Sequence, residues 1–65
     1  MARRRVTQQA SGAWHVVASE SGRVSSVHMS RDEATATARE LVHHQGGGEV
    51  VIEPKDGETS EEDVE

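Results

Sequence analysis

The sequence contains no cysteine, only one aromatic residue and no long apolar run. Without cysteine, neither a disulfide framework nor a thiolate zinc site can form. Trp14 stands alone, so the chain lacks the aromatic set on which single-stranded nucleic acids stack. No segment approaches the ~20 apolar residues that span a bilayer, and the basic start is not followed by the apolar stretch of a secretory signal. We therefore expect a cytoplasmic protein that does not contact membranes.

The chain has 65 residues, enough for one domain with a small core. This size leaves little room for a buried catalytic cleft, and no Ser/His/Asp or Cys/His constellation is evident. We expect a protein that is not an enzyme and uses no cofactor or metal. Small domains without disulfides or metals often need a partner subunit.

Charge is unevenly distributed along the chain, although the net value is -5. Residues 1–48 carry six Lys or Arg against four Asp or Glu, whereas residues 49–65 carry one against eight. The end of the chain, ETSEEDVE, is polar and places like charges side by side, which is typical of a mobile segment. We predict a single domain over residues 1–57 and an acidic, disordered tail over residues 58–65.

One helix is predicted over about residues 30–45. Ser30 and Glu33 form a capping box, in which each side chain satisfies a free backbone amide. Ala34 and Ala38 fall on one helical face together with the aliphatic residues of the next turn. Because alanine is small, this face is expected to lie close against the element that covers it.

Segments rich in β-branched residues predict a small sheet under this helix. AWHVVAS and RVSSVHM are joined through ESG, which indicates a hairpin, and EVVIEP is a third predicted strand. RRRVTQQ is a further candidate strand that pairs with the strand containing Trp14. Alternation turns Trp14 and Val16 toward the core, and Ser25, Val27 and Met29 are expected to share that face.

The hairpin register decides which residues face away from the helix. If Glu20 pairs with Arg23, His15 lies directly opposite His28 on the outer face, at a distance suited to a shared metal ion. No nearby third ligand is evident in the sequence, so we favour solvent-facing or interface histidines and assign no metal.

The order of these motifs resembles a family of small bacterial proteins known as domain of unknown function 2188. The resemblance covers about residues 3–57 and rests on Gly12-x-Trp14, RVSSVH, S-x-x-E-A leading into ARELV, GGEVVI and the final DG. It implies an α+β fold of β-β-β-α-β-β order, with a small antiparallel sheet of three to five strands and one helix on one face. It implies no activity. The acidic end departs from the family pattern, in which basic residues and a tyrosine often follow DG.

The stretch HHQGGG at the predicted helix end looks most like a site. Phosphate-binding glycines precede a helix, whereas Gly46, Gly47 and Gly48 follow one, so we interpret them as a C-cap and an exit into the next strand. His43 and His44 are adjacent and point about 100° apart on a helix, which is unsuited to chelation by the pair alone. They are better explained as helix-end histidines, since the negative end of the helix dipole favours residues that can carry positive charge.

The outer sheet face is the predicted interface. Its candidate residues are three valines and the two strand histidines: Val17, Val24, Val51, His15 and His28. An apolar patch of this kind often marks association, although isolated surface valines favoured for strand propensity are an equal alternative. We expect a non-catalytic binding or accessory module that self-associates as a homodimer or binds an unidentified protein.

The alternative function is weak nucleic-acid binding through Arg3, Arg4 and Arg5. These residues form a basic arm, and a sheet can lie in a nucleic-acid groove. The net charge of -5 and the scarcity of aromatic residues oppose this alternative.

Overall fold

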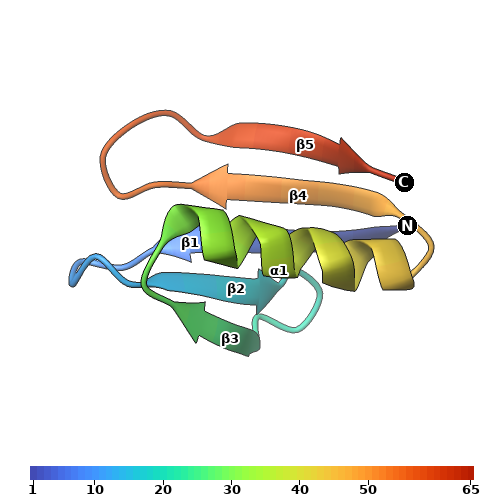
Figure 1. The fold of residues 1–65 in the computed structure, drawn as a ribbon, viewed down its shortest axis with the longest axis horizontal. Coiled ribbons are helices and arrows are strands. Elements are labelled where there is room, and N and C mark those ends of the chain that lie inside the picture. Colours follow the sequence, from blue (N-terminus) through green and yellow to red (C-terminus); the bar gives the residue numbers. More distant parts are fainter.

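The computed structural model describes all 65 residues and consists of one helix packed on one face of a five-stranded sheet (Figure 1). The elements are β1 (Ala2–Gln8), β2 (Trp14–Ala18), β3 (Val24–His28), α1 (Arg31–His44), β4 (Gly48–Glu53) and β5 (Ser60–Val64). The predicted α+β class and the β-β-β-α-β-β order are confirmed, and all of RRRVTQQ except Gln9 lies in the first strand. Figure 1 shows both termini at the same end of the sheet, beside the C-terminal end of α1.

The sheet is mixed, with strand order β3-β2-β1-β4-β5. β1 pairs with β4 in parallel and the other three pairs are antiparallel. The expectation of a purely antiparallel sheet is therefore corrected at this one pair. The reason is the helical crossover. α1 carries the chain back along the sheet after β3, so that β4 runs in the same direction as β3 and β1.

The core lies between α1 and the sheet. Its eight buried residues come from the helix and the three central strands: Val6, Trp14, Val16, Ala34, Ala38, Val42, Val50 and Ile52. Ala34 and Ala38 have no exposed surface, as the predicted helix face requires. The absence of larger side chains at these two positions lets α1 approach the sheet closely.

Both helix ends follow the sequence signals. Ser30 is the N-cap, and its Oγ accepts a hydrogen bond from the Glu33 amide at 3.2 Å. The Ser30 hydroxyl in turn donates to Glu33 Oε2 at 3.5 Å. The Glu33 carboxylate thus contacts the Ser30 side chain and not the Ser30 amide of a standard capping box. At the other end, the Gly46 and Gly47 amides donate to the carbonyls of His43 and Val42. This is a Schellman motif, and Gly46 has the positive φ, 92°, that the motif needs.

Residues 60–64 form a strand, so the prediction of a disordered tail is wrong for them. Glu62 and Arg39 make a two-point contact at 2.7 and 2.8 Å that joins β5 to α1. Val64 packs against the core, and its strand pairs with β4 along its length. Two of the three acidic side chains of β5, Glu61 and Glu62, thus have cationic partners across the fold, which composition alone does not reveal.

The hairpin register also differs from the prediction. Val17 pairs with Val24, but Val16 pairs with Ser26, so Ser25 is an extra residue in β3. This bulge shifts the remainder of the strand by one position, and a shift of one residue turns every side chain to the other face. Val27 consequently faces outward opposite His15. Ser26, in place of Val27, shares the Val16 face.

Candidate interaction surface

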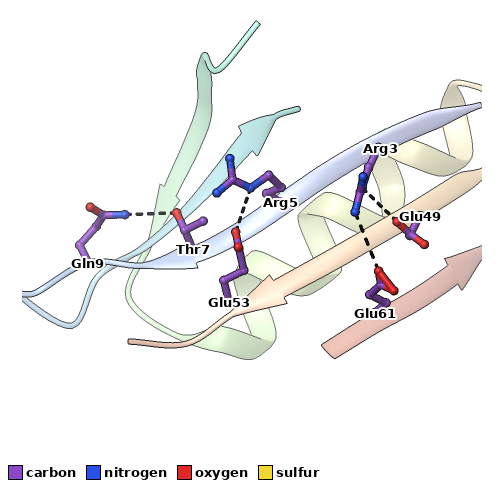
Figure 2. A network of polar contacts seen from close by, with 7 residues as sticks. All are labelled: Arg3, Arg5, Thr7, Gln9, Glu49, Glu53 and Glu61. Carbon is purple, nitrogen blue, oxygen red and sulfur yellow. Dashed lines mark hydrogen bonds and ion pairs between the residues drawn. The ribbon is translucent and has the colours of Figure 1, made fainter. Parts of the chain in front are cut away.

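The outer sheet face, which points away from α1, divides into a charged half and an apolar half. The charged half lies over β1, β4 and β5 (Figure 2). Arg3 Nε lies 3.0 Å from a Glu49 oxygen, and the Arg3 Nη2 atom lies 3.9 Å from Glu61. Arg5 Nε lies 2.8 Å from Glu53. Glu49 and Glu53 lie on β4, next to β1, whereas Glu61 lies one strand further away on β5. The carboxylates leave both arginines locally neutralised.

Val51 lies within this charged half. Its cross-strand neighbours are Arg5 on one side and Glu61 on the other. Only 5% of Val51 is exposed. The sequence placed this valine correctly on the outer face, but the flanking long side chains leave little of its surface available to a partner.

The apolar half lies over β2 and β3. Val17, Val24 and Val27 share it, and we call these three residues the valine surface. Val24 and Val27 are 49% and 57% exposed, and Val17 is half-buried. His15 borders the surface opposite Val27. Two of the three valines were expected here from the sequence, whereas Val27 was placed in the core because the bulge was not anticipated.

His28 lies on the other side of the sheet from His15. It pairs with Trp14, and its Nε2 atom is 2.9 Å from the Ser26 hydroxyl. His15 and His28, which would lie opposite one another if Glu20 paired with Arg23, therefore do not pair, because the one-residue shift at Ser25 places them on opposite faces of the sheet. His28 is also removed from the candidate outer interface.

The histidines at the end of α1 do not converge on a site. His43 contacts the Glu65 carbonyl through Nδ1, and the ring centroids of His43 and His44 are 5.8 Å apart. Nowhere in the chain do three or more His, Asp or Glu residues gather closely enough to hold a metal ion.

The three N-terminal arginines do not form one basic patch. Alternation along β1 places Arg3 and Arg5 on the outer face and Arg4 on the helix side. Arg4 Nη1 donates to the Ser25 hydroxyl at 2.6 Å, whereas the other two arginines pair with glutamates. A phosphate backbone approaching the outer face would meet Glu49, Glu53 and the two arginines together.

The two edges of the sheet have opposite character. β5 reads SEEDV, and its Glu61 and Asp63 side chains are exposed. β3 reads VSSVH and carries no Asp, Glu, Lys or Arg. Edge strands usually bear charges that prevent pairing with other chains. β5 has this protection by charge, whereas β3 has no charged residue and is interrupted only by the bulge at Ser25. β3 also adjoins the valine surface.

Comparison with known proteins identifies the family but not an activity. The family described as uncharacterized protein conserved in bacteria, DUF2188, matches residues 4–64. No curated protein and no solved structure matches the chain. Since the match covers nearly the whole sequence, the chain belongs to this family, as its motifs indicated. The single helix is too short and too polar to cross a membrane.

Proposed function

Because membership of DUF2188 carries no assigned activity, we propose from the geometry that the chain is a non-catalytic, cytoplasmic binding module that joins another protein through β3 and the valine surface. The observation that carries this proposal is the coincidence of an uncharged edge strand with two half-exposed valines. The backbone of the edge offers free hydrogen-bonding groups, and the valines offer apolar area beside them.

The expected binding mode is addition of a strand to the sheet edge. In this mode main-chain hydrogen bonds supply affinity and alternate side chains supply specificity. Completing the burial of two half-exposed valines contributes about 1 kcal/mol each. A few edge hydrogen bonds add about 0.5–1.5 kcal/mol each. After the entropic cost of association, this amounts to a weak complex, with a Kd in the micromolar range or above.

Nucleic-acid binding has less support. Counterion release requires cations that are free to neutralise phosphates, whereas Arg3 and Arg5 already have carboxylate partners. The acidic edge at β5 adds repulsion along the same face. The protein-binding proposal does not depend on these arginines.

Site-specific photo-crosslinking tests the proposal. A photoreactive amino acid is introduced at Val27, or at Ala36 on the exposed side of α1 as the matched control. In a native lysate we expect protein adducts from position 27 that survive nuclease treatment, and few from position 36. Equal labelling from both positions, or adducts that disappear with nuclease, would count against a protein-binding surface at β3.

A further inference from the structure

We propose that the partner bound at β3 is a second copy of this chain, joined by antiparallel pairing of the two β3 strands. The two five-stranded sheets would then form one continuous sheet. This inference rests on the proposed function, because it uses the same edge and the same valine surface. It adds the identity of the partner and the symmetry of the complex.

The charges on the two edges select β3 for pairing with itself. Two β5 strands side by side would bring Glu61 and Asp63 of one copy against the same carboxylates of the other, and like charges directly opposite one another are destabilising. Two β3 strands present only valine, serine and histidine side chains to each other. Of the two edges, only β3 is therefore electrostatically compatible with its own copy.

A twofold axis perpendicular to the sheet produces this pairing. Such an axis leaves the outer face of each copy on the same side, so Val24 and Val27 of both copies meet there in one apolar strip. The α1 helix of each copy lies on the opposite side of the joined sheet. The interface is closed and uses the same residues from both copies, which is the commonest arrangement of small dimers.

The flanks of β3 are complementary in charge. Arg23 immediately precedes the strand, is exposed and has no ion-pair partner in the chain. Asp32 and Glu33 lie in the first turn of α1, just beyond the other end of the strand, and with Arg31 they give this turn a net charge of -1. Antiparallel pairing places the start of one strand beside the end of the other. Arg23 of each copy is thereby directed toward Asp32 of its partner, and symmetry forms this contact twice.

Sedimentation equilibrium from micromolar to millimolar concentration, at physiological salt, measures the association. We expect the wild type to reach twice the monomer mass and no more. Val27→Glu is expected to weaken dimerisation at least ~10-fold, because it places two carboxylates in the apolar strip. Ala36→Glu, on the exposed side of α1, adds the same charge away from the interface and is expected to behave as the wild type.

A charge exchange tests the geometry itself. Arg23→Glu is expected to weaken dimerisation several-fold, and the double variant Arg23→Glu, Asp32→Arg to recover most of the loss. Circular dichroism establishes that each variant is folded. Amide hydrogen exchange of Val24–His28 in the wild type provides a second measurement that requires no substitution. Protection of these amides should rise with protein concentration.

Several results would overturn this inference. A wild type that stays monomeric at millimolar concentration excludes the second copy. A mass that grows without limit indicates head-to-tail pairing of β3 with β5, and failure of the charge exchange to restore the dimer excludes the antiparallel arrangement. If the purified chain is monomeric while position 27 still crosslinks to a different protein, the proposed function survives and only the identity of the partner is wrong. If the purified chain is monomeric and position 27 gives no protein adducts, both the proposed function and the proposed dimer are wrong.

Discussion

Replacing the three glycines after α1 one at a time by alanine tests whether GGG is structural. A Cβ atom at Gly46 would meet nothing within 4 Å. At Gly47 it would lie 2.9 Å from the Val64 carbonyl oxygen, and at Gly48 it would lie 1.8 Å from that of Ala2. Ala2 and Gly48 are register partners in the parallel β1–β4 pair. The overlap at Gly48 is therefore with backbone that cannot move without opening the pair.

These contacts predict a graded loss of stability. Gly46→Ala is expected to lower the free energy of unfolding by about 1–2 kcal/mol, because alanine must adopt the left-handed conformation there. Gly47→Ala adds a displacement at the end of β5, for a total of about 2 kcal/mol or more. Gly48→Ala must also break the first hydrogen bonds between β1 and β4, which raises the cost to about 3–5 kcal/mol. A domain of this length has about 3–10 kcal/mol of total stability, so Gly48→Ala is expected to be largely unfolded or close to it.

Urea unfolding followed by the fluorescence of the buried Trp14 measures this series. Gly22→Ala is the matched control, since Gly22 also has a positive φ and open space around it but lies in the β2–β3 loop. A Gly48→Ala variant as stable as Gly46→Ala would refute the reasoning from close backbone contact. Unfolding in the presence of added phosphate tests the alternative, in which the three glycines bind phosphate. A phosphate cradle requires phosphate to stabilise the wild type and the variants to lose that effect, whereas the structural account expects no such stabilisation.

Substitutions at three further positions probe the helix cap, the core and β5. Ser30→Ala should cost about 1 kcal/mol by removing the N-cap, and Ser30→Asp should not, as urea midpoints would show. Val16→Ala, at a fully buried position, should cost about 2 kcal/mol in the same assay. The hydrogen bonds from Arg39 hold the pKa of Glu62 below its ordinary value of 4.5. The contribution of the Arg39–Glu62 pair to the free energy of unfolding is therefore present above pH 4.5. It is lost as pH falls through the lowered pKa of Glu62 in the folded protein. Glu62→Gln should remove this part of the acid sensitivity, worth about 0.5 kcal/mol for a largely solvated pair.

The helix was predictable because its signals are local. Ser30 caps an amide three residues away, and Gly46 closes the helix through a carbonyl three residues back. Neither interaction depends on which strand lies next to which. The buried alanines at Ala34 and Ala38 follow from the same periodicity. The match to DUF2188 then agrees with an order of elements that these local signals had already indicated.

The acidic strand was not predictable from composition, because its stability depends on distant partners. Residues 60–64 carry three carboxylates, and a local count of charge favours disorder. Two of those carboxylates, Glu61 and Glu62, contact Arg3 and Arg39, which lie far away in the sequence. The alternation of Ser60, Glu62 and Val64 toward the helix side was a local signal, since period two is the pattern of a strand. The β-β-β-α-β-β order implied by the family resemblance also included a last strand.

The bulge at Ser25 determines where the candidate surface lies. With a regular register, Val27 would turn toward α1 and His28 outward, which is the arrangement that alternation alone favours. The observed register instead exposes Val27 and turns the more polar His28 toward the helix. Leaving a valine half-exposed forgoes about 1 kcal/mol of burial. In a monomer whose core contains only eight residues, exposing Val27 brings no compensating stability. The loss is recovered if a second protein covers Val27. The register that sequence alternation did not predict therefore supports an interface at β3.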